Sequence, residues 1–122
     1  MRRSSLFVPV AALALLAVPA LAQSYSDGFT FLKGVRERDA PTVQTLANAG
    51  NPAVLNYRDQ SSGEGALHIL VRGRELDWLR FLLGRGARPA IQTNDGTTPL
   101  IMAALIGCHQ GAEGLVARPA NP

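Results

Sequence analysis

Two separate blocks of this chain repeat at one interval of 33 residues. Residues 83–89 line up with residues 116–122, and Ala66-Leu67-His68 lines up with Pro99-Leu100-Ile101. Two blocks that share one offset arise by chance much less often than a single block does. A period of this length is typical of solenoids, in which each unit buries its apolar face against the next. The chain is therefore expected to fold as a stack of short helical units.

Each unit contains two short amphipathic segments with a break between them. In residues 63–89 the break falls at Gly73-Arg74, and Gly86 follows at a position that favours positive φ. The apolar residues on the two segments recur at helical spacing. They are Leu67, Leu70, Val71, Leu76, Leu79, Leu82 and Leu83. Helices this short are unstable alone in water, so they require stacked neighbours.

These repeats resemble those of the ankyrin family, whose unit has 33 residues and whose first helix starts T-P-L-H-x-A. The matching positions are His68, Leu82, Leu83, Gly86, Gly96, Thr98, Pro99, Leu100, Ala103, Ala104 and Gly107. The resemblance implies an all-α ankyrin solenoid of about two and a half to three helix-turn-helix repeats. Its units would be residues 29–56, 57–89 and 90–122.

The start of the third unit contains side chains suited to these positions. Thr98 can cap a helix through its hydroxyl, and Pro99 fits the first helical turn because no N–H is lost there. Gly96 can adopt the positive φ of a tight turn. Ala103 and Ala104 are small, so we expect them where the paired helices approach closely.

The turn motif is incomplete in both later units. Gly65 and Ala66 replace the Thr-Pro that precedes the motif histidine His68, and Ile101 replaces the histidine of the third unit. The spacing from Asp59 to Leu67, across the finger before the second unit's first helix, is also one residue longer than that from Thr93 to Leu100 across the next finger. We therefore expect loosened turns and a bulge in the first finger.

The second helix of the last unit is expected to be less stable than those of the other units. Gly111 and Gly114 fall within its second helix, where each glycine costs about 1 kcal/mol relative to alanine. They also remove side chains from packing, and Pro119 replaces the glycine that ends the preceding unit. An alternative therefore remains open, that the chain is a truncated fragment or remnant of a longer array without a function of its own.

Residues 1–22 have the three parts of a secretory signal peptide. Arg2 and Arg3 precede an apolar run over residues 10–18, and small residues at Ala20 and Ala22 suit signal peptidase. We expect cleavage after Ala22, a mature domain over residues 23–122, and a periplasmic or secreted bacterial protein with no stable membrane insertion. A retained anchor is the alternative. The mature chain has ten basic and nine acidic residues, which does not favour nucleic-acid binding.

No residue pattern predicts catalysis, a metal site or a cofactor. His68 is expected to be structural because no partner for a catalytic role is evident. Cys108 and His109 are adjacent and point in different directions on a helix, so a packed Cys108 is favoured over a nucleophile or an intermolecular disulfide. Glu75 and Asp77 do not share a helix face. Trp78 and Phe81 are expected to pack, with an exposed aromatic contact as the alternative.

The resemblance implies a non-catalytic protein-binding module. In the ankyrin family, partners bind the concave face formed by the finger tips and the first helices. Carried over to this sequence, that face comprises Tyr57, Arg58, Asp59, Arg72, Gln92, Thr93, Asn94 and Asp95. We expect a protein partner of unidentified kind and a monomeric chain.

Overall fold

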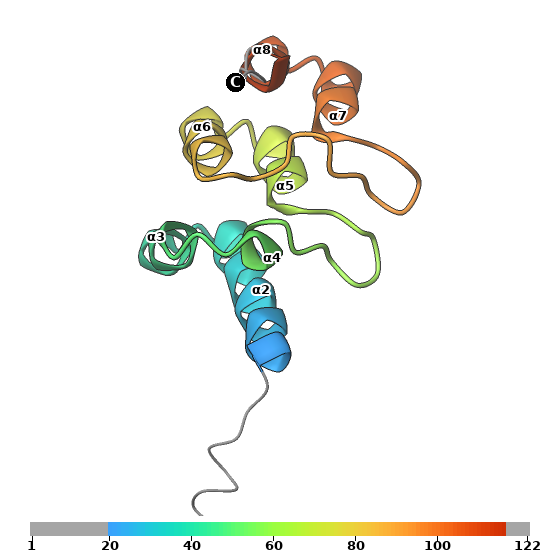
Figure 1. Ribbon diagram of the computed structural model, residues 1–122. Coiled ribbons are helices and arrows are strands. Elements are labelled where there is room, and N and C mark those ends of the chain that lie inside the picture. Colours follow the sequence, from blue (N-terminus) through green and yellow to red (C-terminus); the bar gives the residue numbers. More distant parts are fainter. Residues whose placement is uncertain (1–19, 117–122) are drawn as a thin grey trace, which may run out of the picture.

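Three layers of helices form the part of the chain that the computed structural model describes, residues 20–116. These residues contain seven helices and no strand. The helices are α2 (Ala20–Glu37), α3 (Ala40–Asn48), α4 (Pro52–Leu55), α5 (Ala66–Arg72), α6 (Leu76–Gly84), α7 (Pro99–Ile106) and α8 (His109–Val116). The layers are α2 with α3, α5 with α6, and α7 with α8 (Figure 1). The predicted all-α stack of helix-turn-helix units is confirmed.

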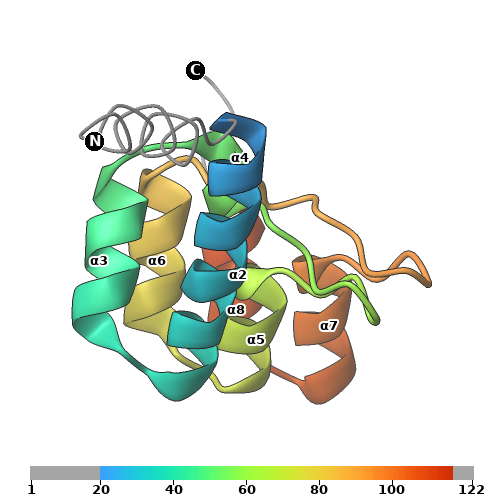
Figure 2. The same cartoon turned by 90° about the horizontal axis from the view of Figure 1, so that it is seen from below.

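Each layer contributes one helix to an inner row and one to an outer row. The inner row is α2, α5 and α7, and the outer row is α3, α6 and α8 (Figures 1 and 2). Two long loops, residues 57–65 and 90–98, project from the same side of the stack beyond the inner row. We call them the first finger and the second finger. None of the helices in residues 20–116 is both long enough and apolar enough to cross a membrane.

The core lies between the two rows and continues through the layers. Leu82 is fully buried and Leu83 nearly so, as the helical spacing predicts. The other buried side chains come from both rows. They include Phe31, Leu32, Val35, Val43, Leu67, Leu70, Val71, Leu79 and Leu115. Trp78 and Phe81 are half-buried and pack against this core, as expected.

Helix ends in the third unit have the geometry expected from the sequence. The Thr98 hydroxyl accepts a hydrogen bond from the Ile101 N–H at 3.1 Å, and Pro99 is the first residue of α7. Gly86, Gly96 and Gly107 all have positive φ. Local sequence therefore fixes where α6 and α7 stop and where the second finger turns.

Arginines at the helix-to-helix turns connect the layers. Arg38 and Arg74 occupy the left-handed region, with φ of +59° and +56°. The Arg38 guanidinium lies 2.8 Å from the Glu75 carboxylate, and Arg74 donates to the Ile106 carbonyl at 2.8 Å. Each arginine thus bonds from its own turn to the next layer, and Glu75 is ion-paired rather than simply solvated.

One prediction for α7 needs correction. Ala103 is buried, but Ala104 is exposed and does not lie between paired helices. Leu100 is 39% exposed although it matches a family position. Within residues 20–116, no further layer lies beyond α7 and α8 (Figure 1).

The prediction that Gly111 and Gly114 remove side chains from packing in α8 is only partly right. Gly111 is buried, and a Cβ added there would lie 2.9 Å from Cys108 Sγ and 3.8 Å from Leu76 Cδ2. The absence of a side chain at Gly111 therefore leaves room for the buried Cys108 side chain, and the distance to Leu76 of α6 is an ordinary contact. Gly114 is less crowded, with only Leu79 Cδ2 near an added Cβ, at 3.8 Å.

Helix α2 starts well before residue 29, where the first unit was placed. It begins at Ala20 and includes Ala22 in its first turns. Residues 1–19 of the proposed signal peptide, and Pro119 with the rest of residues 117–122, lie outside the described part of the chain. The signal peptide and the unit boundaries remain predictions.

Candidate partner-binding surface

The two fingers are bonded to each other rather than projecting independently. The Asn94 N–H donates to the Ser62 carbonyl at 2.9 Å, and Asn94 Nδ2 donates to the Ser61 carbonyl at 2.9 Å. Arg58 bonds within its own finger and across to the other. Its Nε donates to the Gly63 carbonyl and its Nη2 to Asn94 Oδ1, each at 3.1 Å. Arg58 and Asn94 therefore hold the fingers together.

Gly63 makes this close approach possible. Its φ is +80°, and a Cβ added there would lie 2.5 Å from Asn94 Oδ1 and 2.6 Å from Arg58 Nη2. No other residue type fits between the fingers without moving them. The extra residue of the first finger is accommodated here, in a turn closed by the Gly63 N–H on the Asp59 carbonyl at 2.9 Å.

Asp59 organises the turn of the first finger. Its Oδ1 accepts hydrogen bonds from the Ser61 N–H and the Ser62 N–H at 2.8 and 3.0 Å. The Ser61 hydroxyl also donates to Oδ1. The other carboxylate oxygen, Oδ2, is ion-paired with Arg36, whose Nη2 lies 2.8 Å away. These bonds to the Ser62 and Ser61 groups, together with Arg36, hold the pKa of the Asp59 carboxyl well below its usual range.

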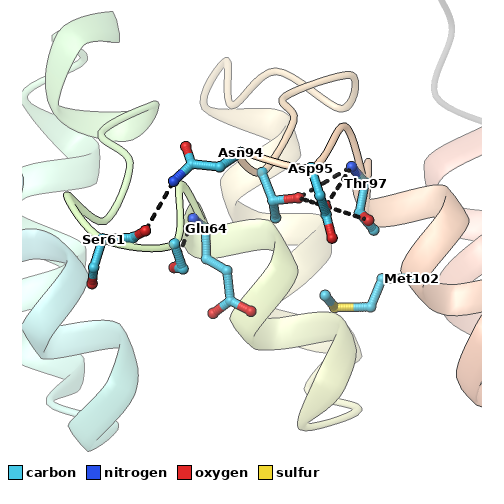
Figure 3. Close-up of a pocket in the computed structure, with 8 residues that line it drawn as sticks. Ser61, Glu64, Asn94, Asp95, Thr97 and Met102 are labelled. Atoms are coloured by element: carbon cyan, nitrogen blue, oxygen red, sulfur yellow. Dashed lines mark hydrogen bonds between the residues drawn. The ribbon is translucent and has the colours of Figure 1, made fainter.

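A hollow of about 340 Å³ opens between the fingers and α7. Figure 3 shows the carboxylates of Glu64 and Asp95 and the thioether of Met102 around it. Asp95 is exposed, and hydrogen bonds from Thr93 and Thr97 lower the pKa of its carboxyl. Glu64 is ion-paired with Arg72 at 2.6 Å. The hollow therefore combines hydroxyl and carboxylate groups with an apolar side.

A second hollow, of about 250 Å³, lies between α2 and the first finger. Tyr57 lines it together with Phe29 and Leu32. The ring of Tyr57 lies against Gly28, where an added Cβ would be only 2.5 Å from it, and meets Tyr25 edge-on at 5.6 Å between ring centroids. Phe29 and Tyr25 are each more than half exposed. This end of the concave face is therefore aromatic.

Sequence reasoning placed Tyr57, Asp59 and Arg58 here but missed Tyr25, Phe29 and Arg36. They lie on α2, beside the first finger. The sequence does indicate that these residues share one face of a helix, because Tyr25, Phe29, Leu32 and Arg36 recur at helical spacing. This face was missed because the first unit was predicted to start only at residue 29.

The other predicted residues lie on the second finger and α5. Gln92, Asn94 and Asp95 are exposed and Thr93 is half-buried, while Arg72 is exposed at the end of α5. Seven of the eight predicted residues thus lie on the two fingers, which project from one side of the stack (Figure 2), and Arg72 is joined to the first finger through its ion pair with Glu64. That these residues contact a partner stays a prediction.

His68 has a structural position. It is fully buried, the Gly65 N–H donates to its Nδ1 at 3.1 Å, and its Nε2 donates to the Thr97 carbonyl at 2.8 Å. The histidine therefore connects the first-finger turn to the second finger, and the expectation that both turns are loosened is wrong at this position. Burial lowers the pKa of His68, so the neutral ring that these bonds require is favoured.

The remaining reactive side chains are separated or packed. Cys108 is buried, His109 is exposed, and Asp77 is almost fully exposed. Within residues 20–116, no group of three or more His, Cys, Asp or Glu side chains could hold a metal ion. Trp78 and Phe81 line a small hollow of about 190 Å³ against α3, on the convex side of the stack.

Comparisons with known proteins found no family model that matches the chain. The chain is 33% identical to the 2-5A-dependent ribonuclease of Homo sapiens over 81 residues, which are 66% of the chain and 11% of that protein. It is 38% identical over 63 residues to an ankyrin repeat protein of Fowlpox virus (strain NVSL), covering 52% of the chain and 18% of the relative. The nuclear factor NF-kappa-B p110 subunit of Drosophila melanogaster is 32% identical over 62 residues, covering 51% of the chain and 6% of that protein. The chain thus spans less than a fifth of the length of these relatives.

Proposed function

We propose that this ankyrin repeat protein, with its all-α solenoid fold, binds a protein partner through the concave face formed by α2, α5, α7 and the two fingers. The observation that carries the proposal is the pair of hydrogen-bonded fingers, which project beyond the inner helices beside two open hollows. Loops held rigid in this way lose little conformational freedom on binding, which favours affinity.

Not all the finger residues are equally available to a partner. Arg58 and Asn94 already bond across the fingers, and the partners of Asp59 are supplied by its own turn and Arg36. Exposed side chains that take no part in these bonds include Tyr25, Phe29 and Gln92, and Phe29 lines the second hollow. Asp95 is exposed in the first hollow, where its Oδ1 also accepts from the Thr93 and Thr97 hydroxyls. Aromatic side chains in such positions contribute strongly to protein interfaces.

The binding proposal is tested by capture from a periplasmic extract on the immobilised chain. The variant Phe29→Ala with Asp95→Asn removes one exposed contact from each hollow and leaves the core untouched. Val116→Ala with Asp77→Asn is the matched control, since both of its residues are exposed away from the concave face. We expect wild type and control to retain the same protein and the concave variant to lose it. Equal capture by all three would contradict the proposed face.

We also propose that the chain is exported and acts in the periplasm after loss of residues 1–22. The basic start, the short apolar run and the small residues at Ala20 and Ala22 support this. Cleavage would leave α2 starting at Gln23, still ahead of its buried residues Phe31, Leu32 and Val35. The intact mass of the protein from a bacterial periplasmic fraction tests the proposal. A mass that starts at Gln23 is expected, and a mass of the full chain in the membrane fraction would contradict it.

A further inference from the structure

The hollow of about 190 Å³ between α3 and α6 is lined by aromatic and aliphatic side chains together with one carboxylate. Its lining residues are Ala40, Val43, Gln44, Asp77, Trp78 and Phe81. It lies between neighbouring helices of the outer row, so it is separate from the concave face and the two hollows there (Figures 1 and 2). We call it the outer-row hollow.

Polar bonds fix the two helices of the outer-row hollow at both of their ends. Arg38, in the turn before α3, is ion-paired with Glu75, which directly precedes α6. At the other end, Nε of Arg85, directly after α6, donates to Oδ1 of Asn48, the last residue of α3, at 2.8 Å. None of these four residues lines the hollow. Its walls are therefore held in place by bonds outside it, and a ligand need not order them.

The aromatic wall of the hollow is suited to a cation. Trp78 and Phe81 pack against the core and are only half-buried, so part of each ring borders the hollow. The face of an aromatic ring attracts a positive charge, and tryptophan does so most strongly. Phe81 already makes such a contact within the chain, because the guanidinium carbon of Arg85 lies 4.7 Å from its ring centroid. One period later Gly111 and Gly114 replace the two aromatic residues, so the next layer does not repeat this wall.

Asp77 supplies a negative charge at the rim of the hollow. Its side chain is 96% exposed, and its ion pair with Arg80, at 3.4 Å, joins two exposed side chains. Pairs of this kind are weak, so the carboxylate can exchange Arg80 for another cation. None of the six lining residues is basic. The lining therefore distinguishes a cation from a neutral apolar group of the same shape, which would gain nothing from Asp77.

The size of the hollow limits what can enter it. Pockets for drug-sized molecules have volumes of roughly 300–1,000 Å³, and about 190 Å³ is room for one small head group. An alkylammonium head fits the lining, since its alkyl groups can contact Val43 and the two rings while its charge lies near Asp77. A metal ion would find a single carboxylate there, which is too few ligands to replace its water.

We propose that the outer-row hollow binds a small organic cation through its alkylammonium head. The alkyl groups pack between Val43 and the rings of Trp78 and Phe81, and Asp77 pairs with the positive charge. The site shares no residue with the concave face, so a protein partner and the cation bind separately. Asp77→Asn should accordingly weaken cation binding and leave capture by the concave face unchanged.

The fluorescence of Trp78, the single tryptophan of the chain, provides the first test. The full chain is titrated at constant ionic strength with choline and with its neutral isostere, in which a tert-butyl group replaces the trimethylammonium head. We expect a saturable change with choline and an affinity about fivefold lower for the isostere. A short lysine peptide, compared with its acetyl-lysine form, shows whether a protein side chain can supply the head as well. Equal affinity for choline and the isostere, or no saturable change with either cation, would overturn the proposal.

Charge variants locate the cation at the hollow. Asp77→Asn should weaken choline binding about fivefold, and Arg80→Gln should strengthen it, because Arg80 no longer competes for the carboxylate. Glu113→Gln is the matched control, since it removes an exposed carboxylate from α8, and it should bind choline as wild type does. All three positions are exposed, so the fold is preserved. Equal affinity of Asp77→Asn and Glu113→Gln would show that the cation does not bind at this hollow.

Discussion

At the scale of single residues, His68 couples the fold to pH. Both of its bonds need the neutral ring, because Nδ1 accepts from Gly65 and Nε2 donates to Thr97. Burial lowers its pKa in the folded state below the ordinary value of about 6.5. The unfolded chain therefore binds more protons in this range, and the free energy of unfolding falls as pH decreases below about 6.5.

Denaturant unfolding at pH 7.5 and 5.5 measures this effect. We expect wild type to lose stability over this interval and the His68→Gln variant, although less stable overall, to lose much of that dependence. His109→Gln removes the exposed histidine and should behave as wild type. If His68→Gln retains the full pH dependence, His68 is not its source. The bonds that lower the pKa of Asp59 stabilise the fold over this whole interval, and their contribution is lost only as pH falls below the ordinary carboxyl range.

Two glycines of α8 differ only in their surroundings, which makes them a matched pair. An alanine Cβ at position 114 meets Leu79 at an ordinary 3.8 Å, whereas at position 111 it lies 2.9 Å from Cys108 Sγ. Gly114→Ala should therefore stabilise the fold by about 1 kcal/mol. Gly111→Ala should gain less or destabilise, because Cys108 must move. Chemical denaturation measures both, and equal gains would mean that Cys108 does not crowd position 111.

At the scale of elements, the two fingers depend on each other. Alanine at Gly63 and at Gly96 carries the same left-handed strain, about 1–2 kcal/mol. Only at Gly63 would the added Cβ also collide with Asn94 and Arg58, since nothing lies within 4 Å at Gly96. We expect Gly63→Ala to destabilise more than Gly96→Ala and to raise amide hydrogen exchange in both fingers. Equal effects of the two substitutions would indicate that the fingers are independent loops.

Helix α6 holds the centre of the core. Leu82 is fully buried there, so Leu82→Ala should cost about 2–5 kcal/mol. Leu105→Ala shortens the same side chain at a largely exposed position of α7 and should leave the stability of the isolated stack nearly unchanged. Thermal and urea unfolding at low protein concentration compare the two. A change within about 0.5 kcal/mol for Leu82→Ala would mean that the helix faces are misassigned.

Sequence periodicity predicted the helices better than it predicted their contacts. Leu82, Thr98 and Gly86 follow from local rules of burial, capping and turn geometry. The bonds of Arg74, Asn94 and Arg58 do not follow, because they join residues more than 30 positions apart and depend on how the layers stack. The exposure of Ala104 was missed for the same reason, since a motif position is buried only where a further layer covers it.

At the scale of the whole molecule, stability comes from contacts between layers, as in other solenoids. Each boundary has an apolar surface and at least one polar bond, from Arg38 at the first and from His68 and Arg74 at the second. We therefore expect one cooperative thermal transition by far-UV circular dichroism. A weak, sloping transition would instead favour the remnant interpretation.

The central claim is that a protein partner binds the concave face. Amide hydrogen exchange of the chain, with and without the captured partner, tests it most directly. We predict protection of residues 57–65 and 90–98 and of the neighbouring helices α2 and α5, with α3, α6 and α8 unchanged. Protection confined to the convex helices α3, α6 and α8 would contradict it.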